Sequence, residues 1–392
     1  MLRTQCASCN VQIPLTAPRC GVCKTRYCGR DCQKTHWKGG HKALCGQIKR
    51  RGGPEEIYAE RNYKEAVAVA VEKCADDTKG QTCYICTEAL HWKTKEGLVR
   101  GCACRGTAGF AHVSCLAEQA KILVAEAEEN NLGDKVKFGR FCRWDLCGLC
   151  EQDYHGVVRC ALGWACWKTY VGRPEADQVR HAAISVLGTG LKEAELYEDA
   201  ATVQEAELST LRRFGKSVVG FLVAQGNLAT SYSALGRFEQ ALLLQRDVYL
   251  GTLKLSGNQH KETFRAAINY TASLANLQRF EEAKSSLRKM TPVARRVLGE
   301  SHEITLKMRT LYAMVLYKDA DATLDDLREA VTTFEDAERT ARRVLGGVHP
   351  LTATMEDDLR KAREILRACE GSEVGSVKSV CEAIGAMTAG DV

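Results

Sequence analysis

The stretch Gly101–Cys115, "GCACRGTAGFAHVSC", holds three cysteines and a histidine within fifteen residues. Cysteine sulfur and imidazole nitrogen are the ligands of structural zinc sites. They form two pairs here, Cys102-x-Cys104 and His112-x2-Cys115, with seven residues between Cys104 and His112. A CxxC or similar short spacing can aim two ligands at one tetrahedral ion. The stretch therefore predicts part of a metal-binding finger.

Two further pairs flank this stretch and complete the ligand set. "CYIC" supplies Cys83 and Cys86, and "CGLC" supplies Cys147 and Cys150. Cys142 could compete with Cys147, but only Cys147 forms a CxxC pair with Cys150. Eight ligands in four pairs are enough for two zinc ions. Residues 83–150 are therefore expected to form one finger with two zinc sites.

The order of four cysteines, one histidine and three cysteines resembles the RING-CH (RINGv) finger, and "CACRGTAGFAHVSCL" resembles its central signature. The PHD finger shares this order, but it normally has a shorter gap before the histidine. It also has an aromatic residue two positions before the last pair, whereas Trp144 lies three before it. The RING-CH resemblance implies that one zinc ion is shared by Cys83, Cys86, His112 and Cys115, and the other by Cys102, Cys104, Cys147 and Cys150.

RING-CH fingers are usually ubiquitin ligase modules that position and activate the thioester of a ubiquitin-conjugating enzyme. Ile85 matches the apolar residue that contacts this enzyme. Gln119 stands where a Trp is expected, and acidic Glu151 stands where a basic residue is common. Trp144 could replace the missing Trp or belong to the core. The resemblance thus implies a RING-type E3 ubiquitin transferase and leaves the question of enzymatic activity open.

Residues 6–45 contain four more ligand pairs, again enough for two zinc ions: Cys6-x2-Cys9, Cys20-x2-Cys23, Cys28-x3-Cys32 and His41-x3-Cys45. The x3 spacing places two ligands on one helical face. His36 competes with His41, but its choice would leave Cys45 without a partner four residues earlier. Fifty residues with few large apolar side chains need metal to supply the folding free energy, about 10–16 kcal/mol per zinc site in peptides.

This spacing and the run "YCGRDCQKTHWKGGHKALC" resemble the MYND-type zinc finger. The resemblance implies interleaved sites, one formed by Cys6, Cys9, Cys28 and Cys32, and the other by Cys20, Cys23, His41 and Cys45. MYND fingers generally bind short proline-containing peptides of other proteins. Four complete pairs leave no open coordination position, so no catalytic residue is expected here.

From about residue 180 the sequence repeats. "LGRFEQAL" at 235–242 recurs as "LQRFEEAK" at 277–284, 42 residues later, and "ARRVLG" occurs at both 294–299 and 341–346. The last unit has a five-residue insertion near "KDADAT". These units resemble the long tetratricopeptide repeats of kinesin light chain, over about 181–368, and imply a groove for peptides or partner helices. The periodic histidines, His260, His302 and His349, are expected to be loop or N-cap residues rather than ligands.

Composition and charge bound the remaining possibilities. No apolar run approaches the length of a membrane span; "VVRCALGWACW" is about half of it. The N-terminus lacks the apolar segment of a secretory signal, so the 20 cysteines indicate metal in a reducing compartment, the cytosol or nucleus. Residues 1–50 carry ten basic residues and one acidic residue. Basic side chains also offset zinc-bound thiolates, so we expect proteins rather than nucleic acid or a membrane as partners.

The predicted fold is multidomain: two small zinc-stabilised cross-brace fingers followed by an all-α tetratricopeptide-type solenoid. We expect a MYND-type finger at 1–50, a helical linker at 51–79, and a RING-CH-like finger with a helical insert and a C-terminal helix at 80–180. Helical repeats are expected at 181–370, followed by a flexible tail at 371–392. Four zinc ions, two per finger, are the expected cofactors. The expected function is a zinc-binding protein-interaction protein of the E3 ligase type; the alternatives are a non-catalytic adaptor or a PHD-like chromatin reader.

Overall fold

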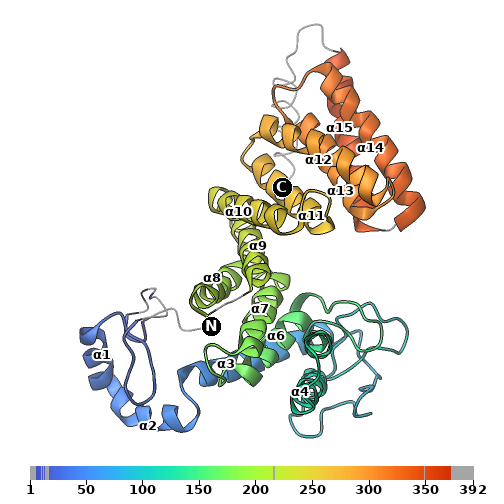
Figure 1. Cartoon of the computed structure of the whole chain (residues 1–392). Coiled ribbons are helices and arrows are strands. Elements are labelled where there is room, and N and C mark those ends of the chain that lie inside the picture. The colour runs from blue at the N-terminus through green and yellow to red at the C-terminus, as the bar shows by residue number, and fades with distance from the viewer. Residues whose placement is uncertain are drawn as a thin grey trace. The chain divides into compact units, whose positions relative to one another are not determined.

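The computed structural model describes residues 6–9, 11, 13, 17–214, 217–347 and 349–371 (Figure 1). The predicted flexible tail lies outside the described residues except for Gly371, and Cys381 lies outside them too. The chain divides into two compact units, Met1–Leu235 and Gly236–Val392. Each of these units is larger than a single finger or repeat, so the division does not test the predicted domain boundaries, which remain predictions.

Zinc-binding fingers followed by an all-helical repeat solenoid are present, as predicted (Figure 1). Among the described residues β-type pairing is limited to three isolated bridges, Arg19 with Arg26, Val99 with Ala111 and Leu146 with Asp153. None of the helices in this part of the chain has the length and apolar character needed to cross a membrane.

The first unit contains nine α-helices within the described ranges. Their bounds are α1 Arg30–His36, α2 Lys42–Arg50, α3 Pro54–Lys73, α4 Val113–Glu129, α5 Asp134–Phe141, α6 Gly156–Tyr170, α7 Gln178–Glu193, α8 Tyr197–Phe214 and α9 Val218–Ala234. A π-helical turn, η1 (Trp37–His41), joins α1 to α2, and a 3-10 turn, η2 (Cys142–Trp144), follows α5.

Helix α6 is the centre of this unit and packs against α3, α4 and α7. Its sequence is apolar on almost all sides, which is why it lies inside the protein, with Leu162, Cys166 and Trp167 almost fully buried. A Cβ atom at Gly190 of α7 would lie 2.8 Å from the backbone oxygen of Arg159, so glycine permits the close approach of α7 to α6. One continuous core therefore runs from α3 through the second finger to α8.

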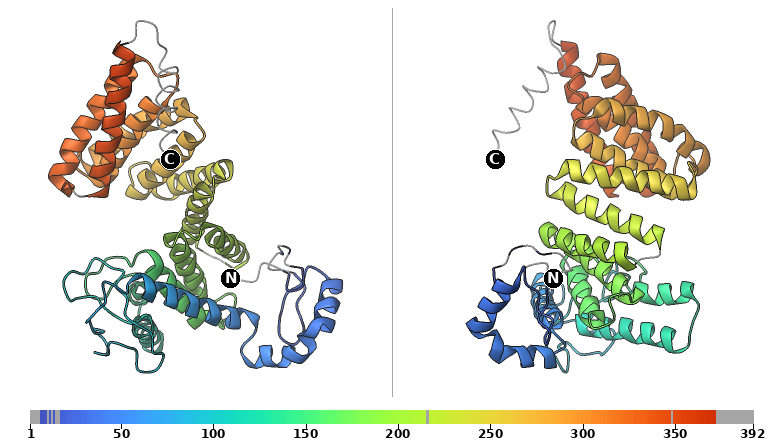
Figure 2. Two further views of the ribbon diagram at one scale, coloured as in Figure 1. Left: turned by 180° about the vertical axis from the view of Figure 1, so that it is seen from behind. Right: turned by 60° about the vertical axis from the view of Figure 1, so that its left-hand side comes forward.

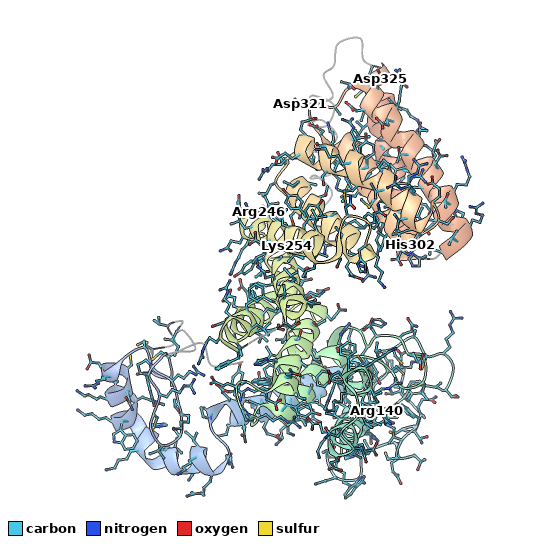
Figure 3. The ribbon with its side chains drawn as sticks, viewed as in Figure 1. Arg140, Arg246, Lys254, His302, Asp321 and Asp325 are labelled. Carbon is cyan, nitrogen blue, oxygen red and sulfur yellow. The ribbon has the colours of Figure 1, made fainter. Side chains whose placement is uncertain are left out.

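The insert of the second finger consists of two helices rather than one. The apolar spacing of "LAEQAKILVAEAEENN" predicts α4, which the structure contains, and Arg140 of α5 forms an ion pair with Glu126 of α4 at 3.6 Å (Figure 3). Of the two alternatives for Trp144, replacement of the missing Trp is wrong and a place in the core is confirmed. Its side chain is 0% exposed and packs edge-on against Tyr170, with 5.9 Å between ring centroids, so it belongs to the core.

The second unit is a stack of six helices over its described residues. They are α10 Phe238–Ser256, α11 Lys261–Asn276, α12 Phe280–Leu298, α13 Glu303–Lys318, α14 Leu324–Leu345 and α15 Pro350–Gly371. Each helix packs against the next one along the chain. In addition, α11 contacts α13, and α13 contacts α15 (Figure 2). The predicted insertion forms the loop between α13 and α14, where Figure 3 labels Asp321.

The periodic glycines and histidines punctuate these helices. Gly257, Gly299 and Gly346 end α10, α12 and α14 with φ angles of 78°, 91° and 90°, a region that favours glycine. His260 and His302 are N-caps whose Nδ1 atoms accept the backbone N–H two residues later, at 3.3 and 3.2 Å. Figure 3 labels His302 at the start of α13. The prediction that the histidines are capping residues rather than ligands is confirmed at both helices.

Candidate metal centres

The structure gathers sixteen cysteine and histidine side chains into four groups, and the ligand atoms of each group lie within 4.8 Å of one another. Each group has the membership that the two resemblances implied. The groups are Cys6, Cys9, Cys28 and Cys32; Cys20, Cys23, His41 and Cys45; Cys83, Cys86, His112 and Cys115; and Cys102, Cys104, Cys147 and Cys150.

The distances within the groups fit a tetrahedral zinc ion. A Zn–S bond of about 2.3 Å gives a tetrahedral edge of about 3.8 Å between sulfurs. The Sγ atoms lie 3.7 Å apart for Cys9 and Cys28, 3.7 Å for Cys20 and Cys45, and 3.8 Å for Cys104 and Cys147. Four groups of four ligands fit four zinc ions, two in each finger.

The thiols of each group shift one another's pKa. Every group contains a cysteine whose pKa lies above its ordinary value, and each group also contains a cysteine whose pKa is lowered: Cys6, Cys20, Cys83 or Cys150. Contact with Cys32 is the first cause that raises the pKa of Cys28 to about 12. Burial, followed by contacts with Cys20 and Cys23, raises the pKa of Cys45 to about 12. Burial is also the first cause that raises the pKa of Cys104 to about 11, and it raises the pKa of Cys115. A divalent cation would allow all the thiols of a group to ionise together.

Three of the CxxC pairs share one backbone turn. The residue after the second cysteine, Lys24, Thr87 or Glu151, has a φ of 65°, 65° or 57°, and its N–H donates to the carbonyl of the first cysteine at 3.0, 2.8 or 3.1 Å. Backbone N–H groups of Ile85 and Leu149 also point at Sγ of Cys83 and Cys147, both at 3.4 Å. These turns hold the sulfurs together and stabilise their negative charge.

The structure distinguishes the two competing histidines of the first finger. His41 is 2% exposed and its Nε2 lies 3.3 Å from Sγ of Cys23. His36 stacks on the His41 ring with 4.8 Å between centroids, and its Nδ1 lies 3.0 Å from the hydroxyl of Tyr27. His36 therefore supports the ring of His41 and stays outside the group, as the spacing of Cys45 indicated.

His112 takes the opposite ring orientation in the second finger. Its Nδ1 lies 3.3 Å from Sγ of Cys86 and 3.6 Å from Sγ of Cys115, and its Nε2–H donates to the carbonyl of Ala89 at 3.4 Å when Nδ1 faces the metal. Burial lowers the pKa of His112, which favours the neutral imidazole that a metal binds.

A surface beside the two zinc groups of the second finger includes the predicted contact residue. Ile85 is 37% exposed, and Leu149, at the same position of the last CxxC pair, is 51% exposed. A Cβ atom at Gly148 would lie 3.7 Å from Oε1 of Gln119 and 3.8 Å from the hydroxyl of Tyr84. Sequence reasoning missed Leu149 and Tyr84, although the equivalent position of Leu149 in its pair was a usable signal.

The basic charge of the first finger is partly neutralised within the protein. Arg26 is 4% exposed and lies 3.5 Å from the carboxylate of Glu55, and Arg19 lies 3.0 Å from that of Glu175. Both carboxylates belong to segments outside the finger. These arginines are therefore engaged with the protein's own acidic residues.

Comparisons with known proteins agree with this geometry. Family models match as "MYND finger" at residues 6–45, "RING-variant domain" at residues 83–131 and "Tetratricopeptide repeat" at residues 221–262. The RING-variant match ends before Cys147 and Cys150, which the fold brings back to Cys102 and Cys104. No curated protein matches the chain.

The solved structures that resemble part of the chain include the following three. Two are of Podosopora anserina putative kinesin light chain nearly identical TPR-like repeats, one of them a variant with a single substitution. The variant has a TM-score of 0.41 and 16% identity, and the unsubstituted form 0.40 and 14%; each match covers 59% of this chain and 97% of the other. BtubC (BKLC) from P. vanneervenii has a TM-score of 0.36 and 13% identity, covering 67% of this chain and 94% of its own.

The class of the protein follows from its parts. Two fingers whose four Cys/His groups fit zinc, together with helical repeats, define a zinc-binding protein of the protein-interaction type. More particularly, the chain carries a MYND finger, a RING-variant domain and a tetratricopeptide repeat.

Proposed function

We propose that the protein is a RING-CH-type E3 ubiquitin ligase, in which the helical repeats and the MYND finger recruit the substrate through peptide motifs. The sixteen residues of the four groups are the proposed zinc ligands. The RING-variant finger would bind a ubiquitin-conjugating enzyme and activate its thioester without forming a covalent intermediate. Catalysis would then rest on a surface rather than on a nucleophile of this chain.

The observation that carries this proposal is the convergence of three elements. Ile85 and Leu149 stand exposed on the first and last CxxC turns of one finger. Tyr84, beside Ile85, and Gln119 of α4 both approach Gly148, beside Leu149. The two turns and α4 therefore meet at one place, which gives a partner two apolar anchors around a polar centre.

A chain-formation assay tests the proposal. The zinc-loaded protein is combined with activating enzyme, ubiquitin and a panel of conjugating enzymes. We expect chains with at least one enzyme, and we expect Ile85→Ala to reduce them about tenfold without releasing zinc, as for an apolar anchor of an interface. Val136→Ala is the matched control, because Val136 is an exposed apolar residue on α5 of the same finger.

A non-catalytic adaptor is the second candidate, and Gln119 and Glu151 favour it. Neither residue offers the aromatic or basic contact usual at its position. An adaptor would form no chains with any conjugating enzyme while holding four zinc ions. In a ligase, Gln119→Trp or Glu151→Arg should increase the rate of chain formation, whereas neither substitution should create activity in an adaptor.

We infer that the protein works in a reducing compartment, the cytosol or nucleus. Fourteen of the sixteen proposed ligands are cysteines, and zinc binds cysteine as the thiolate. Within the described part of the chain, all the cysteines are free thiols. Oxidation of the ligand thiols to disulfides would release the metal.

A further inference from the structure

A third turn in the second finger copies the backbone of the zinc-binding turns but has no cysteine. In the first CxxC turn, the N–H of Cys83 donates to the carbonyl of Glu88 at 3.0 Å, and Thr87 N–H donates to that of Cys83 at 2.8 Å. In residues 91–96, His91 N–H donates to the carbonyl of Glu96 at 2.9 Å, and Lys95 N–H donates to that of His91 at 2.8 Å. Lys95 has a φ of 59°, close to the 65° of Thr87.

Side-chain hydrogen bonds close this turn, which we call the His91 turn (residues 91–96). His91 occupies the position of the first cysteine, and Thr94 occupies that of the second. The hydroxyl of Thr94 donates to Nδ1 of His91 at 2.8 Å, and the backbone N–H of Thr94 approaches the same atom at 3.1 Å. The imidazole and the hydroxyl thus take the positions that two sulfurs take in the other turns.

The His91 turn lies against the third zinc group. The ring of His91 is 8% exposed and meets the ring of His112 edge-on, with 5.3 Å between centroids. Ala89, just before the turn, supplies the carbonyl that accepts from Nε2 of His112. The His91 ring therefore contacts the His112 ring, and the carbonyl of Ala89 contacts the ring nitrogen of His112 that faces away from the sulfurs.

The other end of the turn is fixed between two members of the same group. Glu96 accepts from the backbone N–H and the hydroxyl of Ser114, at 2.6 and 2.8 Å. Ser114 lies between His112 and Cys115 in the first turn of α4, and its hydroxyl also lies 3.1 Å from that of Tyr63 on α3. Both ends of the His91 turn are thus tied to the segment that carries His112.

We propose that the His91 turn positions His112 for zinc, with His91, Thr94 and Glu96 as positioning residues. This inference rests on the proposed ligand role of His112 and is independent of ligase activity. The turn fixes the Ala89 carbonyl and the face of the His91 ring, which together hold the imidazole with Nδ1 toward the sulfurs. Residues that orient a metal-binding histidine typically change metal affinity by about 10–100-fold.

Zinc release from the full-length protein tests the proposal. A chromogenic chelator follows the loss of the four ions, and imidazole NMR of His112 reports which nitrogen carries the proton. We expect Thr94→Val to accelerate the release of one ion of the four by about tenfold. We also expect it to speed exchange of the Nε2–H proton of His112 with water.

Two conservative variants separate positioning from general loosening. Thr94→Ser retains the hydroxyl and should keep the zinc release rate normal. His91→Asn places an acceptor oxygen near the position that Nδ1 of His91 occupies, so it should change the release rate less than His91→Ala does. Lys93→Ala is the control, because Lys93 is an exposed residue on the same turn. Release of all four ions at the normal rate from Thr94→Val and His91→Ala would overturn the proposal.

The His112→Ala variant distinguishes failure of this inference from failure of the ligand assignment. If His112→Ala binds four ions as tightly as the original chain, His112 is not a ligand and both ideas fall. If His112→Ala weakens the binding of one zinc ion, while Thr94→Val and His91→Ala leave the zinc release rate unchanged, only the positioning role is wrong. Accelerated release of several ions from Thr94→Val would also contradict it, since that result indicates general unfolding.

Discussion

The first and second fingers share a ligand pattern but differ in what surrounds it. In the first finger the buried apolar cluster comprises Ile13, Ala17, Tyr27 and four cysteines. In the second, the zinc-group cysteines join a core that includes Trp144, Trp167 and the apolar faces of α3, α4, α6 and α7. The cysteines of the zinc groups therefore make up more than half of the buried cluster in the first finger, whereas in the second they lie at the edge of a larger apolar core.

Removal of zinc should produce the largest difference in folding between the two fingers. Chelation is expected to unfold residues 17–50, because zinc sites of this type contribute about 10–16 kcal/mol in peptides. Helices α6 and α7 should remain folded, since their packing is apolar. Hydrogen exchange with mass spectrometry would measure both, and native mass spectrometry should count four ions before chelation. If residues 17–50 stay protected from hydrogen exchange without metal, the first finger does not depend on zinc more than the second does.

Truncation of Trp144 should affect only the second finger. Trp144→Ala removes a fully buried indole and is expected to lower the free energy of unfolding by about 3–5 kcal/mol. Phe138→Ala is the control, because Phe138 is 70% exposed, and it should change stability little. Urea unfolding followed with zinc release measures both variants. Equal destabilisation of the first finger by Trp144→Ala would show that the two interiors are coupled.

Rising pH should weaken the apolar core of the first unit. Burial raises the pKa of Glu207, on α8, from its ordinary value of 4.5 to about 7. Its neutral form contributes stability that is fully present below pH 4.5 and is lost as the pH rises through about 7. At pH 8.5, Glu207→Gln should therefore exceed the original chain in stability by roughly 3 kcal/mol.

The pH dependence of Tm measures this effect. The difference between Glu207→Gln and the original chain should shrink as the pH falls from 8.5 to 5. A constant difference over that range would show that Glu207 does not titrate in the folded protein.

The smallest predicted effect concerns the helix caps of the second unit. His302→Ala removes the acceptor for the Ile304 N–H and should cost about 1 kcal/mol, whereas His302→Asn should cost less because asparagine is a good N-cap. Thermal unfolding of the full chain measures the two variants. A loss of several kcal/mol would indicate that His302 has a role beyond capping.

Much of the metal chemistry could be predicted from sequence because it depends on local spacing. A CxxC pair closes a turn between residues near in the chain, so Cys83 with Cys86 and Cys147 with Cys150 can be recognised without the fold. The repeat histidines behave similarly, since capping is a local contact. The choice of His41 over His36 also followed from spacing, although the support that His36 gives to His41 did not.

Other features could not be predicted because they join distant segments. Trp144 had two interpretations from sequence, and only its packing on Tyr170 places it in the core. The approach of Tyr84 and Gln119 to Gly148 joins two turns and a helix. Leu149 is recognised as a candidate contact residue only because it lies next to Gly148 at this junction. The His91 turn was missed because histidine and threonine do not form a recognised ligand pair.

The sequence by itself determined which residues pair locally, which segments become helices and how many zinc ions the fingers fit. Residue type and spacing decide these matters, because short-range ligand turns and helix caps involve neighbours in the chain. Only the tertiary structure decided which side chains leave solvent and which turns meet. Burial and convergence depend on contacts between segments far apart in sequence, such as α6 against α3 and α7, and no local pattern encodes them.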